Sequence, residues 1–164
     1  MAVYIRVRLR RTHLKQDRFV SLAEQVLSAA GAPASELSIE LIGDHRMRRL
    51  NRVYRKKDRT TDVLAFPMRE APAPHPSPLM PELLGDVVIS VPTALRQAKG
   101  AGRTLDDELA VLLVHGVLHL CGYDHERNEK EAARMHRRER AVLQRIRPVP
   151  RLVICRVEQR KRSR

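Results

Sequence analysis

The sequence is poor in aromatic residues and in cysteine, and each shortage excludes a class of protein. It has no tryptophan, two phenylalanines and three tyrosines, so the core must be aliphatic. With so few aromatic rings, recognition of bases in the manner of RRM or OB-fold modules is not expected. The two cysteines have no paired spacing, which excludes a disulfide framework and favours a reducing cytoplasm.

Long hydrophobic runs are missing as well. No apolar stretch approaches the roughly 18 residues that a membrane helix requires, and the N-terminus lacks the apolar segment of a signal peptide. We therefore expect a cytoplasmic protein without membrane contact. Its 164 residues suit one domain with a real core. We place this domain at residues 1–150 and a basic tail at 151–164, where 152–155 fit a short strand and 158–164 a disordered end.

Acidic residues are few beside basic ones, 19 against 32, which gives a net charge of +13. The basic excess is concentrated in residues 1–15, in residues 46–59 and from Arg134 onward. A solvated surface explains any single run of this kind, whereas three runs in one small domain indicate a polyanionic partner such as nucleic acid. Because aromatic rings are scarce, we expect phosphate contacts to dominate the binding.

Apolar periodicity predicts an α+β fold. Strands are indicated where apolar residues alternate or run together between turn residues, and helices where they recur every three or four positions. The predicted architecture is one small mixed sheet of about four strands flanked by helices. Residues 67–81 hold six of the ten prolines and therefore form a long surface loop outside the sheet. The predicted strands are 2–9, 37–42, 61–66 and 86–91, and the predicted helices are 17–30, 44–54, 92–99, 105–120 and 128–146.

The strongest functional signal is a group of three histidines, His115, His119 and His125. The first two are four positions apart, which places them on one face of a helix about one turn apart. Gly122 then ends the helix, since glycine enters the left-handed conformation at little cost, and the following turn could return His125 as a third ligand. Three imidazoles with an open fourth position are typical of catalytic zinc, although nickel and copper also accept such a set.

Residue 116 separates this motif from that of the zinc peptidases. Those enzymes carry a glutamate general base directly after the first histidine, whereas this chain has Gly116. The sequence therefore argues against a peptidase, because the general base that peptide hydrolysis needs is absent from this position. Cys121 lies next to a candidate ligand, but neighbouring side chains on a helix diverge. We expect it to be a small buried hydrophobic residue.

Three segments together resemble one family. They are the run from Tyr54 to Pro67, the run from Leu84 to Ser90, and His115 to His125, which reads H-G-x-L-H-L-x-G-Y-D-H residue for residue. In this order and spacing they resemble the YbeY family, bacterial metal-dependent endoribonucleases implicated in ribosomal RNA maturation and ribosome quality control. The resemblance spans roughly residues 38–140.

The resemblance implies a four-stranded sheet flanked by helices and one zinc ion per chain, held by His115, His119 and His125. It implies catalysis by His115 together with an arginine of the Y-R-x-K-D segment, which is Arg55 in this chain. It also implies single-stranded RNA as the substrate, a role in 16S ribosomal RNA 3′-end maturation, and the ribosome or ribosomal proteins as partners.

Arg55 has a physical argument in its favour as well. Cleavage of a phosphodiester concentrates negative charge on the phosphoryl oxygens, and the guanidinium fork matches phosphate geometry. Glu108, two helical turns before His115, and Asp124, beside His125, are predicted to hydrogen-bond the ligand imidazoles. The alternatives are a helix-start carboxylate for the former and a turn-forming aspartate for the latter. The predicted RNA contacts near Arg55 are Arg52, Lys56, Lys57 and Arg59.

Two other functional interpretations stay open. A zincin-type peptidase is opposed by Gly116 and by the basic charge. The second is a non-catalytic RNA-binding ribosome assembly factor, in which zinc has only a structural role and holds the histidine helix and the following turn together. Basic charge and a metal site agree with this interpretation too. Structural zinc usually has four protein ligands and favours cysteine, so the motif favours catalysis.

Overall fold

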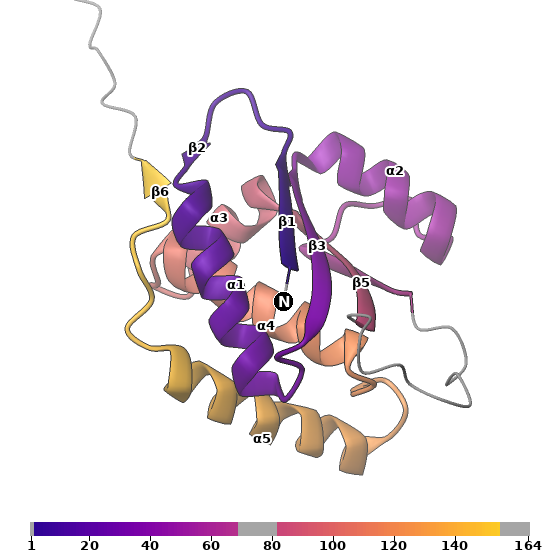
Figure 1. The fold of residues 1–164 in the computed structure, drawn as a ribbon. Coiled ribbons are helices and arrows are strands. Elements are labelled where there is room, and N and C mark those ends of the chain that lie inside the picture. Colours follow the sequence, from indigo (N-terminus) through magenta and orange to yellow (C-terminus); the bar gives the residue numbers. More distant parts are fainter. Residues whose placement is uncertain (1, 69–81, 155–164) are drawn as a thin grey trace, which may run out of the picture.

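The computed structural model describes residues 2–68 and 82–154, so residues 69–81 of the proline-rich loop and residues 155–164 of the expected tail lie outside it. Strands and helices follow one another through the described chain (Figure 1). They are β1 (Ala2–Val7), β2 (His13–Leu14), α1 (Gln16–Ala30), β3 (Ser35–Ile42), α2 (Asp44–Arg55), β4 (Val63–Pro67), β5 (Glu82–Ser90), α3 (Val91–Gly100), α4 (Leu105–Leu120), α5 (Glu129–Ile146) and β6 (Val153–Ile154).

Four of the strands form one mixed sheet in the order β1-β3-β5-β4. β1, β3 and β5 run parallel, and β4 returns antiparallel beside β5. The predicted α+β fold with one small mixed sheet is therefore confirmed. β5 begins at Glu82 rather than at residue 86, because its first residues pair with the start of β3. β2 and β6 form a second, two-stranded antiparallel sheet that the sequence did not predict.

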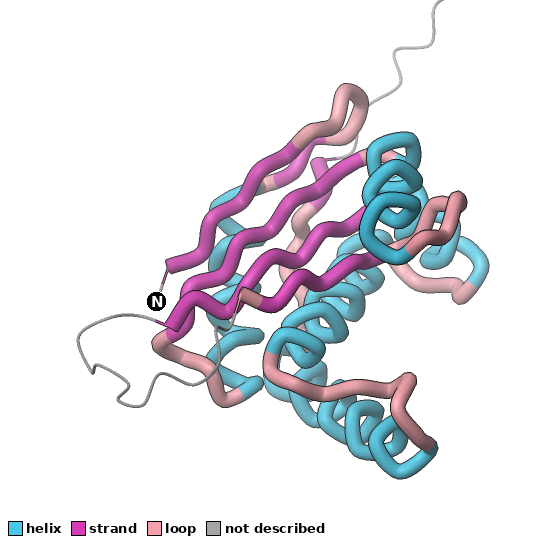
Figure 2. Tube along the Cα trace, turned by 90° about the vertical axis from the view of Figure 1, so that its right-hand side faces the viewer, coloured by secondary structure: helices cyan, strands magenta, loops and turns pink. Residues whose placement is uncertain are grey.

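The two faces of the larger sheet are covered unequally. α1, α4 and α5 pack together on one face, whereas α2 lies over one end of the other (Figures 1 and 2). Strand residues alternate accordingly: Ile39 and Val87 enter the main core, while Leu64 and Val88 join Met47 of α2 in a smaller one. Within the described residues, no helix is both long and apolar enough to cross a membrane.

The C-terminal part of the described chain is held against the start of α4. The carboxylate of Asp106 accepts hydrogen bonds from the backbone nitrogens of Leu152 and Val153, each at 2.9 Å. Leu152 is fully buried, and β6 pairs with β2. Residues 152–154 therefore pack against the body of the protein. Short buried segments of this kind carry no periodicity, so the sequence pattern gives little sign of such packing.

One carboxylate joins α2 to the rest of the fold. Asp44, the first residue of α2, accepts hydrogen bonds from the hydroxyls of Ser90 and Thr93 at 2.7 and 2.6 Å. Arg96 lies 2.8 Å from its other oxygen. Burial raises the pKa of Asp44, but these partners outweigh burial and hold the pKa below its ordinary value of 3.8. Asp44 thus fixes the start of the helix whose other end carries Arg55.

Replacing Asp44 with asparagine should therefore destabilise the protein by about 1–2 kcal/mol at neutral pH, because its hydrogen-bond donors lose a charged acceptor. Since the pKa is lowered in the folded state, the wild-type contribution is present above pH 3.8 and is lost as the pH falls below that value. Urea unfolding of both proteins across this range is the measurement. A difference between them that stays constant into the acid range would contradict the role given to the ionised carboxylate.

Candidate metal centre

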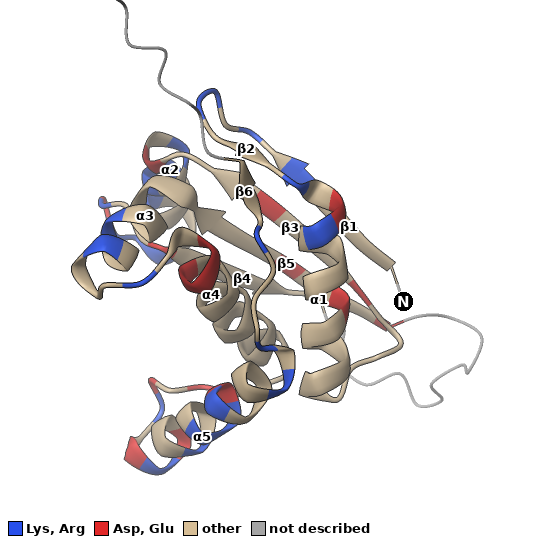
Figure 3. Ribbon diagram, turned by 90° about the vertical axis from the view of Figure 1, so that its left-hand side faces the viewer, with Lys and Arg blue, Asp and Glu red and all other residues tan. Residues whose placement is uncertain are grey.

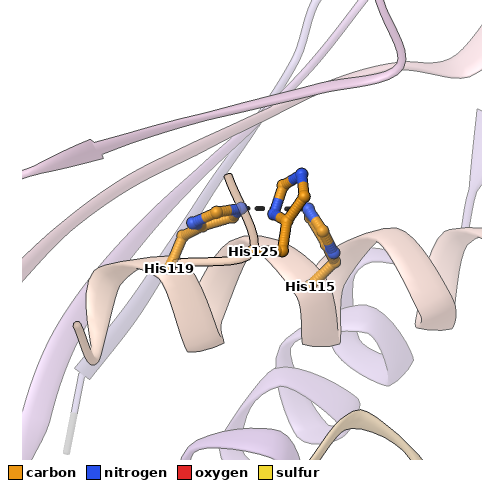
Figure 4. Close-up of side chains that lie close together, drawn as sticks. All are labelled: His115, His119 and His125. Atoms are coloured by element: carbon orange, nitrogen blue, oxygen red, sulfur yellow. Dashed lines mark hydrogen bonds between the residues drawn. The ribbon is translucent and has the colours of Figure 1, made fainter. Parts of the chain in front are cut away.

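α4 presents two of the three histidines from one face. His115 and His119 lie a turn apart near the end of this helix. The helix stops as predicted at Gly122, whose φ of 96° is left-handed. The backbone nitrogens of Gly122 and of the residue after it donate to carbonyls in the last turn, both at 3.0 Å. This turn reverses the chain and brings His125 to the other two histidines (Figure 4).

The three imidazoles converge with the spacing that a single metal ion requires. One ring nitrogen of each lies within 4.8 Å of the other two, and the Nε2 atoms of His115 and His119 are 3.1 Å apart. Tetrahedral zinc with bonds of about 2.0–2.1 Å would separate two ligand nitrogens by about 3.3 Å. The three histidines could therefore hold a metal ion. In the part of the chain that the structure describes, no other histidine, cysteine or acidic cluster has this geometry.

The surroundings of His119 favour the neutral imidazole, which is the form that binds a metal. Burial lowers the pKa of His119 below its ordinary value of 6.5, and the neighbouring His115 and His125 lower it further. A neutral ring keeps a lone pair on one nitrogen. Protons therefore compete weakly for His119 at neutral pH.

A glutamate from another helix orients His115. Glu139 of α5 accepts a hydrogen bond from Nδ1 of His115 at 2.5 Å. Burial raises the pKa of Glu139, but the contacts with His115 outweigh it and lower the pKa below its ordinary value. An ionised carboxylate only accepts, so Nδ1 carries the proton and the lone pair of Nε2 is left for a metal. Glu139 was not predicted from the sequence. At helical spacing it shares a face of α5 with the buried residues Met135 and Val142, and an acidic residue on that face was the one indication of its role.

The two carboxylates that we predicted for this role, Glu108 and Asp124, have other partners in the structure. Glu108 is buried, and its side chain lies 2.7 Å from Arg103. Burial raises the pKa of Glu108, and Arg103 opposes this. Asp124 accepts a hydrogen bond from the backbone nitrogen of Glu126 at 2.9 Å, which is a turn-forming role. Glu139 makes the hydrogen bond to His115 that was expected of them.

The histidines open into a cleft of about 820 Å³. Its other wall is the end of α2 and the loop that follows, which contribute Arg55, Lys57 and Arg59. Asn51, itself buried, holds this loop by donating to the carbonyl of Arg59 at 2.8 Å. The wall that α2 and its loop form opposite the histidines is therefore basic. Other acidic residues gather at the first turn of α4 (Figure 3). The rest of the cleft lining includes three acidic residues, Asp62, Asp124 and Glu126.

Arg55 reaches from its helix to the histidine turn. Its guanidinium lies 3.3 Å from the carboxylate of Glu126, the residue after His125. Both side chains are about half exposed, and an exposed ion pair contributes little stability. An incoming phosphate can therefore displace Glu126 from Arg55.

The other basic residues predicted to contact RNA divide into two groups. Lys57 and Arg59 line the cleft. Lys56 points away and donates to a backbone carbonyl within α2 at 3.1 Å, and Arg52 lies 4.0 Å from an aspartate of the loop. Arg127, which the sequence did not single out, also lines the cleft. The only indication of Arg127 in the sequence was its position two residues after His125.

Gly116 lines the cleft, and a side chain at this position would point at the sheet. A Cβ atom at this position would lie 2.7 Å from Cγ1 of Val87 and 3.4 Å from Cγ2 of Val63. A glutamate side chain does not fit there without moving the helix. The missing peptidase base is thus a consequence of how α4 packs.

The fold and the site together define a small α+β protein with a candidate three-histidine metal centre in a basic cleft. The family model described as endoribonuclease YbeY matches residues 4–147. An endoribonuclease YbeY of Geobacter metallireducens is 46% identical over 143 residues, which are 87% of this chain and 93% of the relative. One from Aquifex aeolicus is 42% identical over 140 residues, 85% of this chain and 89% of the relative. The chain belongs to the YbeY family of endoribonucleases.

A solved structure agrees with this assignment at the level of the fold. The solution structure of a Thermotoga maritima protein is similar to this chain with a TM-score of 0.60 and 23% identity. The likeness covers 88% of each chain. The mixed sheet and its helices are therefore shared over nearly the whole length.

Replacing Glu139 with glutamine should weaken zinc binding by about 10- to 100-fold, the usual effect of losing a carboxylate that orients a ligand histidine. Competition with a chromogenic chelator measures this affinity. Glu129→Gln is the matched control, because it removes the same charge from an exposed position on the same helix. Glu129→Gln should bind zinc like the wild type. Equal affinities for all three proteins would show that Glu139 does not position His115.

Proposed function

We propose that the protein is a zinc-dependent, single-strand-specific endoribonuclease that acts in 16S ribosomal RNA 3′-end maturation and in ribosome quality control. The observation that carries this proposal is the meeting of three histidine nitrogens with Arg55 across one basic cleft. The curated relatives are named endoribonucleases, which supports RNA as the substrate. The net charge of +13 supports a polyanionic partner.

His115, His119 and His125 would hold the zinc ion, one per chain. Neutral imidazole nitrogens suit zinc, and three protein ligands leave the fourth position open. Zinc bound there would lower the pKa of its water toward about 7 and supply a nucleophile at neutral pH. The chain prepares the ligands for this, because Glu139 fixes the tautomer of His115 and burial keeps His119 neutral.

Arg55 would bind the scissile phosphate opposite the histidines. Phosphate accepts two parallel hydrogen bonds from a guanidinium, and such charge-assisted pairs are stronger than neutral hydrogen bonds. The same contact stabilises the charge that develops on the phosphoryl oxygens during cleavage. Lys57 and Arg59, which line the cleft beside Arg55, would hold the flanking phosphates.

A single strand suits this cleft better than a duplex. A flexible strand can place one phosphate between the histidines and Arg55, whereas an A-form helix is recognised by its shape across a wide, shallow groove. Ribosomal proteins as partners and a cytoplasmic location stay predictions that are consistent with this substrate.

Zinc content and RNA cleavage, measured on the same preparations, test the proposal. The wild type should contain one zinc per chain and cleave single-stranded RNA, and His115→Ala should lose both properties. Arg55→Ala should keep its zinc and lose about a hundred- to a thousandfold in cleavage rate, as expected when a charge-stabilising donor is removed. Arg49→Ala, at an exposed position on the same helix, should cleave like the wild type.

Three results would count against this account. Stoichiometric zinc with cleavage no greater than that of His115→Ala would favour the non-catalytic RNA-binding assembly factor. Cleavage that survives in His115→Ala would indicate a contaminating nuclease. Unchanged turnover by Arg55→Ala would remove that residue from the mechanism.

A further inference from the structure

Among the residues that the structure describes, none covers much of the width of the sheet face that carries α2. This face forms a groove of about 570 Å³, here called the sheet groove, which reaches from β1 across β3 and β5 to β4 and α2. We propose that the sheet groove binds bases of the RNA strand on one side of the cleavage point. This inference rests on the proposed function, since it names where the same substrate extends beyond the metal cleft.

Strand register places the side chains of the sheet groove in rows. Residues paired across neighbouring strands share a face of the sheet, as do residues two apart on one strand. Tyr4 and Phe66 end the first row, and a strand spacing of about 4.8 Å places them about 14 Å apart, enough for more than one base. This row is Tyr4, Ser38, Asp86 and Phe66, and the next is Arg6, Glu40, Val88 and Leu64.

Three of the chain's few aromatic residues, Tyr4, Tyr54 and Phe66, line the sheet groove. Tyr4 and Tyr54 are 60% and 63% exposed, and the rings of Tyr54 and Phe66 lie edge to face with centroids 5.0 Å apart. Exposed aromatic rings on a four-stranded sheet are the platform on which RRM modules stack bases. The scarcity of aromatic residues argued against base stacking, but the fold concentrates those that exist on one surface.

The sheet groove adjoins the metal cleft. Tyr54, Phe66 and Pro67 line both hollows. A strand whose scissile phosphate lies between the histidines and Arg55 would therefore pass Tyr54 and Phe66 first and reach Tyr4 at the far edge. The position of the groove directly beside the metal cleft favours the substrate strand over a protein ligand as its occupant.

The charges in the sheet groove suit bases rather than phosphates. Glu40 and Asp86 both line it, and carboxylates repel phosphate but accept hydrogen bonds from base amino groups. The charge of Glu40 is balanced by Arg8 at 2.8 Å and Arg46 at 3.5 Å. Bases would thus lie against the sheet while the backbone phosphates stay toward solvent and the basic cleft.

Fluorescence anisotropy with labelled single-stranded RNA tests this inference. A tetranucleotide fills only the metal cleft, whereas a dodecamer extends over the sheet groove. Tyr4→Ala should weaken dodecamer binding at least about fivefold, the lower end of what one stacked base contributes, and leave tetranucleotide binding unchanged. Tyr4→Phe and Tyr4→Trp keep a ring and should restore the affinity. Val53→Ala, an exposed apolar position outside both hollows that is 50% exposed, is the control and should bind like the wild type.

The outcomes separate this inference from the proposed function. Equal dodecamer affinity for the wild type and Tyr4→Ala, with both proteins folded, would overturn the inference, and the sheet groove would then be a docking surface for a protein. The wild type could also bind RNA without cleaving it, while Tyr4→Ala lowers the dodecamer affinity. That result would support base binding in the sheet groove and refute the proposed nuclease activity. Cross-linking of a photoreactive base to Tyr4 would support it independently.

Discussion

Helix α4 touches strand β5 at a point where a glycine stands in place of a side chain. Gly116 on the helix lies against Val87, and a Cβ atom there would lie 2.7 Å from Cγ1 of that valine. A methyl group at this position would push the helix away from the sheet or cost about 1–3 kcal/mol in overpacking. His115 lies one residue before this contact, so the depth of the metal centre in its cleft depends on this close approach.

Two glutamates of the site have opposite environments and therefore opposite roles. Glu139 is largely buried and bonds His115 at 2.5 Å, so it fixes one ligand in one orientation. Glu126 is more than half exposed and lies 3.3 Å from Arg55, so water and phosphate compete with it. The histidine side of the cleft is thus held firmly and the partner of Arg55 is exchangeable, which suits the binding and release of a polyanion that the proposed function requires.

Local patterns in the sequence predicted the elements and the histidine cluster, because helical spacing and a left-handed glycine act within a few residues. Contacts between distant segments could not be predicted in this way. Glu139 reaches His115 from another helix, and Tyr4 and Phe66 line the same groove only because of the strand order. Glu108 was chosen because it shares a stripe with His115, but seven residues rise about 10 Å along a helix, and Arg103 is its nearer partner.

In the function that we propose, one zinc ion on three histidines makes this protein a nuclease. The most direct test is to titrate zinc into metal-free protein and to follow bound zinc and cleavage of single-stranded RNA together. The account predicts that cleavage rises in proportion to bound zinc and stops rising at one ion per chain. Cleavage by the metal-free protein at the full rate, or full zinc occupancy without cleavage, would contradict it.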